Sequence, residues 1–220
     1  AARSVVLAVA VVLAACSGRS DDWFPSPPGA KWRYAIVVQT TDLRRQSRLT
    51  LLGLAPVMVE GRRLERRRVN AGLLHYYERA NGGVARVAIQ RPVDEGPVFE
   101  TEAQPVLPLP VTVGSRWRQP SVTRVLEATV DPFRRKYRME EPVQLEFVVE
   151  ADDDTVTVPA GRYQGCLRVK ASGKTRFKGD KTIFPTDVTV AQTDWYARGV
   201  GLVGSERVET TGSQVLPGGR

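Results

Sequence analysis

Three short patterns occur twice along this chain, in the same order each time. The first is Gly29-Ala30-Lys31-Trp32-Arg33, which returns as Gly114-Ser115-Arg116-Trp117-Arg118. The second is Gly61-Arg62 with Arg68-Val69, which returns at the same offsets as Gly161-Arg162 with Arg168-Val169. The third is Tyr76-Tyr77-Glu78-Arg79 with Gly82 and Val84, which returns as Trp195-Tyr196-Ala197-Arg198 with Gly201 and Val203. Such self-similarity indicates one structural unit used twice. We predict a β unit over residues 29–104, a second over residues 105–210 and a flexible tail over residues 211–220.

Each pattern has a structural explanation in a β protein. A glycine before an inward tryptophan lets the chain turn into a strand whose indole covers the core. The Gly-Arg pattern begins another strand, and the aromatic pattern ends one at a turn that contains glycine. We therefore expect an all-β, antiparallel fold, in which two repeated curved-sheet units form a barrel-like or half-barrel body with Trp32, Trp117 and Trp195 inward.

The rest of the sequence agrees with this fold class. No window keeps a 3.6-residue apolar period over three turns, so helix should be scarce. Segments rich in Val, Leu, Tyr, Thr and Arg are separated by Gly, Pro, Asn or Asp, as strands are by turns. The predicted strands are residues 32–41, 48–54, 57–60, 62–69, 73–78, 84–90, 121–130, 143–151, 155–158, 163–172, 188–196 and 202–210.

The apolar run of residues 5–15 ends in Leu13-Ala14-Ala15-Cys16, which resembles the lipobox cut by bacterial lipoprotein signal peptidase. Eleven residues of helix reach about 16 Å, well short of the roughly 30 Å hydrocarbon core, so a signal peptide fits this run better than a membrane-spanning helix. The resemblance implies a signal peptide over residues 1–15. It also implies a mature chain that begins at Cys16, with diacylglycerol on its thiol and an acylated amino terminus.

The residues after the lipobox predict where the protein is held. Residues 16–28 are rich in Ser, Asp, Pro and Gly, which predicts a linker behind the lipid. Fully extended, this stretch spans about 40 Å, so the folded body stays close to the membrane. Ser17 follows the cysteine, whereas aspartate there retains lipoproteins at the inner membrane in enterobacterial systems. The resemblance therefore implies the bacterial cell envelope, at the outer membrane and facing the periplasm.

The charge of the chain bears on its partners. Lys and Arg number 32 against 24 Asp and Glu, and removing Arg3 with residues 1–15 leaves 31 against 24, a net charge near +7. Such a charge favours contact with anionic lipid or with an envelope protein. Nucleic acid is not an expected partner of an exported lipoprotein. The runs Arg62-Arg63, Arg66-Arg67-Arg68 and Arg134-Arg135-Lys136 favour a solvated sheet surface over a dedicated patch, since side chains alternate between the faces of a strand.

No pattern predicts catalytic residues or a metal site, and we expect no cofactor. Cys166 lies in a strand-like run, which favours a buried small hydrophobic residue over a nucleophile. His75 is the single histidine, so it cannot form a multi-histidine metal site, and no Gly-x-Ser-x-Gly elbow accompanies it. We expect a partly buried strand histidine beside Tyr76 and Tyr77.

Three further motifs have structural explanations or stay open. Residues 199–204 match Gly-x-Gly-x-x-Gly, but a dinucleotide site needs a following helix and an acid about twenty residues on; we expect a hairpin turn at Gly201. Asp152-Asp153-Asp154 lacks the spacing and glycine of a calcium loop, which favours a charged hairpin turn. Glu140 with Glu141 stays open as an acid pair for glycoside chemistry, because that chemistry depends on separation in space.

The second unit carries a family resemblance. Its residues are Val156-Thr157-Val158-Pro159-Ala160-Gly161-Arg162-Tyr163, Cys166-Leu167-Arg168-Val169 and Trp195-Tyr196-Ala197-Arg198-Gly199-Val200-Gly201-Leu202-Val203. They resemble a family of secreted bacterial lipoproteins of unknown function, called TapB-like, which departs from this chain at Arg198, where it has proline. The family implies an all-β exported domain and brings no catalytic residues.

The sequence leaves three functions to compare. The favoured one is a membrane-anchored envelope lipoprotein that acts as a non-enzymatic binding or structural module. A carrier of lipid or lipoprotein is an alternative, and it requires an apolar cavity of several hundred Å³. A carboxylate-dependent hydrolase is another, and it requires two acids converging in a cleft. A binding module needs only an exposed surface.

Overall fold

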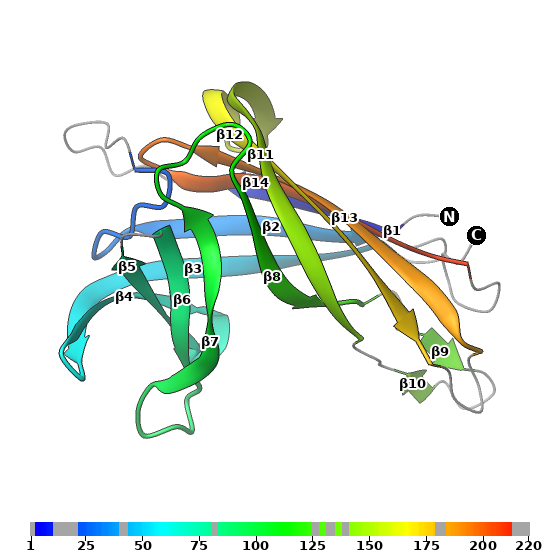
Figure 1. Ribbon diagram of the computed structural model, residues 1–220, viewed down its shortest axis with the longest axis horizontal. Helices are drawn as coiled ribbons and strands as arrows, with labels where there is room; N and C mark the ends of the chain where they lie inside the picture. The colour runs from blue at the N-terminus through cyan, green and yellow to red at the C-terminus, as the bar shows by residue number, and fades with distance from the viewer. Residues whose placement is uncertain are drawn as a thin grey trace.

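A computed structural model gives the fold and describes residues 3–10, 22–39, 44–80, 83–124, 128–130, 135–137, 141–178 and 184–212. About three quarters of this is β-strand (Figure 1), and helix within these ranges is limited to a three-residue 3-10 turn, Asn70–Gly72. No helix in the described ranges is long and apolar enough to cross a membrane. The predicted all-β, antiparallel fold with scarce helix is confirmed.

Twelve strands form one large antiparallel sheet, and two short strands form a second. The bounds are β1 (Arg3–Ala10), β2 (Lys31–Gln39), β3 (Arg44–Val59), β4 (Arg62–Val69), β5 (Leu74–Ala80), β6 (Gly83–Gln90), β7 (Val98–Pro108), β8 (Arg116–Val122), β9 (Ala128–Val130), β10 (Arg135–Tyr137), β11 (Pro142–Val158), β12 (Gly161–Phe177), β13 (Thr186–Ala197) and β14 (Gly201–Thr211). The order across the large sheet is β7-β6-β5-β4-β3-β2-β1-β14-β13-β12-β11-β8, and β9 pairs with β10.

The large sheet consists of two units on either side of β1. Strands β2 to β6 lie side by side in chain order with β7 at the outer edge, and β8, β11, β12, β13 and β14 form the second unit in the same way. The Gly-Trp pattern spans the start of β2 and the start of β8. The Gly-Arg pattern lies where β4 and β12 begin, each just after the turn of a hairpin. The predicted pair of curved-sheet units is confirmed, and the sheet curls into a half-barrel (Figure 1). The first unit extends to Pro108, because the predicted boundary between residues 104 and 105 falls inside β7.

The two units share a backbone detail at their first strands. The amide of Gly29 donates to the carbonyl of Gly53 (2.9 Å), and the amide of Gly53 donates back to the residue after Gly29 (2.8 Å). In the second unit the amide of Gly114 donates to the carbonyl of Val149 (2.8 Å), and the amide of Val149 donates back to the carbonyl of Ser115 (3.0 Å). Gly29 and Gly114 have φ of 84° and 91°, a conformation that glycine adopts without steric cost. Gly53 and Val149 are therefore equivalent positions.

The longest strands correct the sequence prediction. The sequence predicts two strands in place of β3 and two in place of β11, because Pro56 and Asp152-Asp153-Asp154 resemble turns. In the structure both strands continue through bulges, between Leu54 and Val57 in one and between Val149 and Val156 in the other. A bulge bends a strand without ending it. The predicted hairpin turn at the three aspartates is wrong, since all three lie within β11.

Strand β7 and the start of β8 are absent from the sequence prediction. Prolines cause the omission, since Pro105 and Pro108 lie in β7 and Pro120 lies in β8. Proline cannot donate to a ladder, but an edge strand tolerates it. Both strands are edges of the sheet.

The main core joins the two units. Its buried members from the second unit lie on β11, β12 and β13, and they pack against Tyr77, Val84 and Leu107 of the first. The sequence leaves open whether the units share a core, and the structure shows that they do. A second cluster, around Leu64 and Tyr76, lies within the curl of the first unit.

The three landmark tryptophans do not all lie in the interior. Trp32 is 4% exposed, and Trp117 stacks on Phe147 with ring centroids 5.2 Å apart. Trp195 is adjacent in β13 to Tyr196, which belongs to the main core. Because neighbouring residues of a strand face opposite sides, Trp195 lies on the other side of the sheet, against the cluster of Cys166. The prediction of an inward Trp195 is therefore wrong.

Candidate functional site

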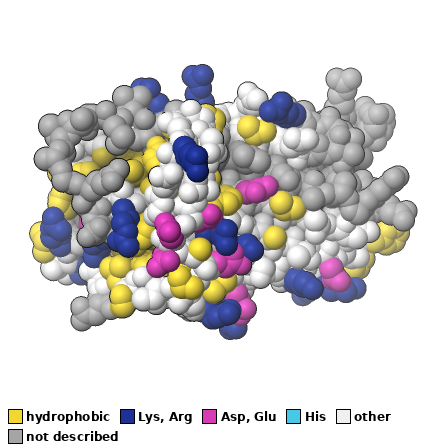
Figure 2. Space-filling model, turned by 90° about the horizontal axis from the view of Figure 1, so that it is seen from above, with side chains coloured by type: hydrophobic (Ala, Val, Ile, Leu, Met, Phe, Trp, Pro, Cys, Tyr) yellow, Lys and Arg dark blue, Asp and Glu magenta, His cyan; other side chains and the backbone are white. Residues whose placement is uncertain are grey.

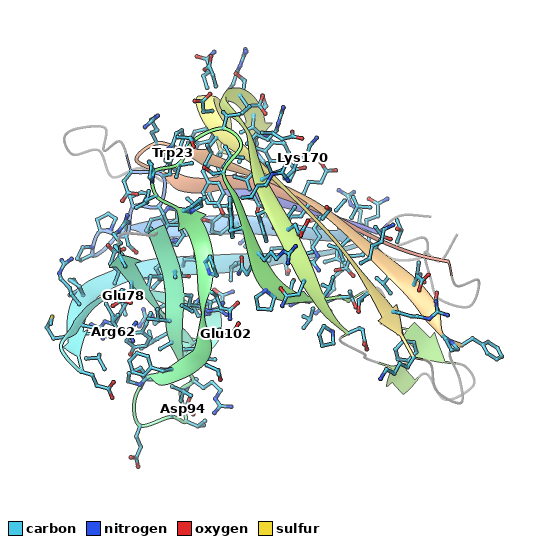
Figure 3. The ribbon with its side chains drawn as sticks, in the orientation of Figure 1. Trp23, Arg62, Glu78, Asp94, Glu102 and Lys170 are labelled. Carbon is cyan, nitrogen blue, oxygen red and sulfur yellow. The ribbon has the colours of Figure 1, made fainter. Side chains whose placement is uncertain are left out.

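The segment just before β2 is packed into the body. Trp23 and Phe24 are 6% and 5% exposed and belong to the main core, and Pro25 is buried. Figure 3 labels Trp23 among the side chains at the β12 and β14 end of the molecule. Within the predicted linker of residues 16–28, residues 23–25 are buried in the body, because their apolar side chains gain free energy from leaving water. Residues 16–21 lie outside the described residues and would span about 20 Å at most.

Arg67 of β4 fixes this segment from inside the protein. Its guanidinium lies 3.6 Å from the ring centroid of Phe24, 4.7 Å from that of Trp32 and 5.5 Å from that of Tyr77. It donates to the carbonyl of Pro25 (2.8 Å) and to Oγ of Ser26 (3.0 Å).

The electrostatics of Arg67 are unusual for an arginine. The residue is 4% exposed, and the described residues show no ion pair for it. Burial is the main cause that lowers the pKa of Arg67, against opposing contributions from Tyr77 and Tyr34, yet arginine stays charged in proteins. Burying a charge without a counter-ion is costly. The ring faces and the two hydrogen bonds offset that cost. The same contacts hold residues 24–26 in place.

Arg79 of β5 holds the same segment from its edge. It forms ion pairs with Asp22 (2.8 Å) and Glu65 (2.6 Å) and donates to the carbonyl of Phe24. Asp22 also accepts from the amide of Phe24 (2.8 Å), and its carbonyl accepts from Gly199 (2.8 Å). We call Arg67, Arg79 and Gly53 the anchor clamp.

The two units differ at the positions that form the clamp. Gly53 matches Val149 by hydrogen bonding, and the offsets of the Gly-Arg pattern match Arg67 with Leu167. In the second unit both positions carry buried core side chains. In the first unit a Cβ at Gly53 would lie 2.3 Å from the carbonyl oxygen of Pro27. The first unit has therefore exchanged two core residues for space and hydrogen bonds that receive residues 22–28.

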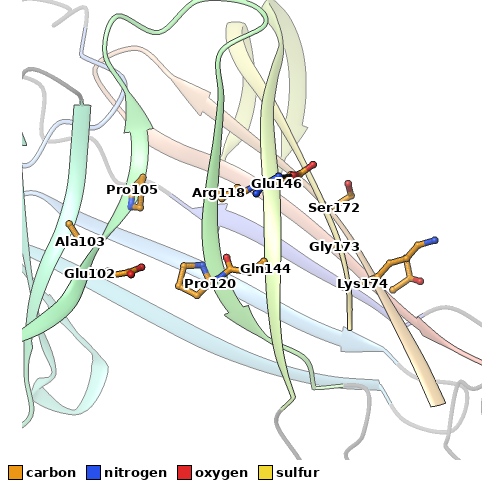
Figure 4. Close-up of a pocket in the computed structure, with 11 residues that line it drawn as sticks. Glu102, Ala103, Pro105, Arg118, Pro120, Gln144, Glu146, Ser172, Gly173 and Lys174 are labelled. Atoms are coloured by element: carbon orange, nitrogen blue, oxygen red, sulfur yellow. Dashed lines mark hydrogen bonds and ion pairs between the residues drawn. The ribbon is translucent and has the colours of Figure 1, made fainter. Parts of the chain in front are cut away.

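A second candidate site is an open groove where the two edge strands approach each other (Figure 4). Its volume is about 720 Å³, and it is lined by β7, β8, β11, β12 and β13. The lining residues are Glu102, Ala103, Pro105, Arg118, Pro120, Gln144, Glu146, Ser172, Gly173, Lys174 and Thr189. We call it the edge groove.

The edge groove combines charged side chains with a larger share of apolar surface. Arg118 donates through Nε to Glu146 (2.8 Å) across the β8–β11 pair. Glu102 on one side and Lys174 on the other enter no ion pair among the described residues. Pro105 and Pro120 lie on the two edge strands and remove ladder donors there. A partner in this groove would therefore be bound through side chains, by charged groups and by apolar surface.

The lipobox residues Leu13, Ala14, Ala15 and Cys16 lie outside the described residues, as do Gly82 and Glu140. Gly29, Gly61, Gly114, Gly161 and Gly201 all have positive φ, next to strands. Gly201 begins β14 in the hairpin from β13, so a strand follows the Gly-x-Gly-x-x-Gly motif where a dinucleotide site has a helix. The structure therefore assigns these glycines to turns.

The remaining candidates for chemistry are enclosed or bonded. Burial raises the pKa of the Cys166 thiol to about 11, and the residue is fully buried. His75 is partly buried on β5 with Nδ1 3.2 Å from Oη of Tyr77, as the sequence predicts. Asp154 accepts from Trp195 Nε1 (3.0 Å) and from Arg168 (3.0 Å). Glu141 bonds to Thr123 through its backbone only: its carbonyl accepts from the amide of Thr123, and its amide donates to Oγ1 of Thr123.

The arginine runs serve different purposes. Arg62 and Glu78 lie together on β4 and β5 (Figure 3), with Nη2 2.6 Å from Oε2. Basic and acidic side chains are interspersed on the face shown in Figure 2, which agrees with a solvated sheet surface. Arg67 is the exception, and the sequence prediction misses it because a buried arginine stands between two more accessible ones. Aligning the two units would have revealed it, since its counterpart is Leu167.

In the described ranges, no group of three or more His, Cys, Asp or Glu residues could hold a metal ion. No family model, no curated protein and no solved structure matches this chain. The resemblance to TapB-like lipoproteins therefore rests on the quoted residues alone.

Proposed function

We propose that this chain is a membrane-anchored bacterial envelope lipoprotein that acts as a non-enzymatic binding or structural module. The observation that carries the proposal is the anchor clamp. Its segment begins at Asp22, six residues after the cysteine of the lipobox. A lipid on Cys16 would thus hold the body within about 20 Å of the membrane.

The anchor clamp would make the attachment between lipid and body rigid. Arg67 and Arg79 grip residues 22–26 through backbone carbonyls, ring faces and ion pairs. A load on the lipid is therefore transmitted to the core and to both units. Such a rigid attachment suits a module that presents one surface, the edge groove, to a partner in the envelope.

Two features weigh against the alternatives. The core between the units is filled by Trp23, Phe24 and Leu107, and the edge groove is open to solvent, whereas a lipid carrier encloses its acyl chains. In the edge groove, Glu146 is held by Arg118, whereas a hydrolase needs two acids directed at a substrate. Native mass spectrometry of the protein from membrane extract tests the carrier alternative, which a co-purified lipid would favour.

The anchor is tested by comparing the two cysteines. The full chain is expressed in a bacterium with a traceable fatty acid, as wild type, Cys16→Ala and the matched control Cys166→Ala. Wild type and Cys166→Ala should carry label and have the mass of a chain starting at residue 16 plus its attached lipid, whereas Cys16→Ala should be unlabelled and unprocessed. A Cys16→Ala chain that is still cut at the same bond and labelled contradicts the proposal.

A further inference from the structure

Strand β1 occupies a central position in the sheet although it lies within the predicted signal peptide. It pairs antiparallel with β14, from Arg3 opposite Glu209 to Ala8 opposite Gly204. On its other side it pairs with β2, from Ser4 opposite Gln39 to Ala10 opposite Arg33. We call the space between β2 and β14 the strand slot.

We propose that maturation empties the strand slot, and that the slot of the processed protein binds an extended, apolar strand of another exported polypeptide. The inference rests on cleavage before Cys16, which belongs to the proposed function. Once residues 1–15 leave, β2 and β14 each keep one neighbour, β3 and β13. Each then presents a row of backbone donors and acceptors to the slot.

The slot is held open by contacts that do not involve β1. Neighbouring strands lie about 4.8 Å apart, so β2 and β14 are about 10 Å from each other. Trp32 Nε1 donates to the carbonyl of Val200 (2.7 Å), and Tyr34 Oη donates to that of Leu202 (3.2 Å). These side chains bridge the two units at one end of the slot. Direct pairing of β2 with β14 would break these bonds and repack the shared core.

Both edges of the slot can form a complete ladder. The sequences of β2 and β14, KWRYAIVVQ and GLVGSERVETT, contain no proline. The outer edges differ, since β7 carries Pro105 and Pro108 and β8 carries Pro120. Proline on an edge opposes the addition of another strand. The outer edges β7 and β8 therefore carry this protection, whereas β2 and β14, which β1 covers, lack it.

The residues beside the slot define the occupant. Along β2, the residues opposite β1 are mainly apolar: Tyr34, Ala35, Ile36, Val37 and Val38. Along β14, Arg207 and Glu209 pair with each other (2.8 Å), so they require no charge from a partner. The seated strand has the sequence RSVVLAVA, which is uncharged after Arg3. The expected partner segment is about seven residues of Val, Leu and Ala without proline, bound by strand addition.

The experiment uses the processed chain, residues 16–220, with Cys16→Ser so that it stays unlipidated. Two labelled peptides are compared: RSVVLAVA flanked by lysines, and the same peptide with Val6→Pro. Fluorescence anisotropy measures binding, and hydrogen exchange measures protection of the β2 and β14 amides. We expect the first peptide to bind and protect both strands, and the proline peptide to bind at least tenfold more weakly, because it lacks a ladder donor.

Several results would overturn the proposal. They are β2 and β14 amides already protected without peptide and unchanged by it, equal binding of the two peptides, or a dimer whose dissociation exposes these amides. The same protection from phosphatidylglycerol vesicles would assign the slot to acyl chains instead. A processed chain that folds only when RSVVLAVA is added supports the proposal, and one that folds under neither condition overturns it.

The two proposals fail separately. Intact mass of the protein purified from membranes shows whether residues 1–15 are removed. Retention of these residues would contradict both the anchor and the emptied slot. Removal with a closed or inert slot would leave the anchor standing and refute the slot alone.

Discussion

At the residue scale, the first unit differs from a plain repeat through a few side chains. Arg67 replaces the kind of core residue that Leu167 provides in the second unit. His75, close by on β5, contacts Tyr77, which in turn contributes a ring to the Arg67 cluster. A small group of polar and aromatic side chains thus holds residues 22–28 against the body.

Arg67→Ala should lower the free energy of unfolding by about 3 kcal/mol, since it removes two hydrogen bonds and the contacts with three ring faces. The matched control is Arg68→Ala, at the next and exposed position of β4, which should change it by less than about 0.5 kcal/mol. Urea denaturation followed by tryptophan fluorescence measures both. Equal effects of the two variants would mean that Arg67 does not hold the segment.

His75 should make stability depend on pH. Burial, reinforced by Arg86 and Arg67, lowers the pKa of His75 from 6.5 to about 4. Between these values the unfolded chain binds the proton more tightly, so stability is full above pH 6.5 and falls as the pH drops toward 4. Because His75 is partly exposed, the loss between pH 7 and pH 5 should be about 1–2 kcal/mol.

Because His75 is the single histidine, its contribution to the pH dependence of stability can be measured by comparing wild type with His75→Gln. Carboxylates titrate equally in wild type and His75→Gln, so the variant should lose about 1–2 kcal/mol less between pH 7 and pH 5. Urea denaturation at the two pH values gives the comparison. Parallel losses in both proteins would show that His75 is not the titrating group.

At the element scale, long bent strands and edge strands shape the molecule. Strands β3 and β11 continue through bulges at related places in the two units, which curls each unit. Proline-bearing β7 and β8 form the edges, and the groove lies between them. Residues 22–28, although they form no helix or strand, pack against β3 at Gly53.

Gly53→Ala should displace that segment, because its Cβ would lie 2.3 Å from the carbonyl oxygen of Pro27. We expect a loss of about 2 kcal/mol of unfolding free energy from overpacking, together with faster proteolysis within residues 22–28. The control is Gly96→Ala, where no atom lies within 4 Å of the added Cβ, and it should be near neutral. Unchanged proteolysis in Gly53→Ala would refute the packing argument.

At the scale of the whole molecule, the two units are joined by one main core. The main core takes residues from both and encloses Trp23 and Phe24. A lipid on Cys16, the anchor clamp and this core would form one mechanical path from membrane to sheet.

Leu107→Ala tests this unity. Leu107 lies on β7 of the first unit, is 1% exposed and packs in the shared core. The variant should lose about 3 kcal/mol, and hydrogen exchange should show β12 and β13 of the second unit losing protection along with β5 and β6. Val98→Ala, on the same strand at a 48% exposed position, serves as the near-neutral control. Loss confined to the first unit would indicate two independent cores.

The fold class, the presence of two related units and the turn glycines could be predicted from the sequence, because alternation, glycine placement and repeats are local signals. It also predicted the burial of Cys166 and His75. It missed β7, since proline in an edge strand resembles a turn, and it placed Trp195 on the wrong side, since facing depends on register.

Three features are visible only in the folded protein: the units share a core, Trp23 and Phe24 belong to it, and Arg67 is buried. These depend on contacts between residues far apart in the chain, where the energy of packing outweighs local composition. A Pro- and Ser-rich segment looks like a linker until Gly53 and Arg67 are seen to receive it. The position of β1 between β2 and β14 is of the same kind, because strand pairing joins segments that no local pattern connects.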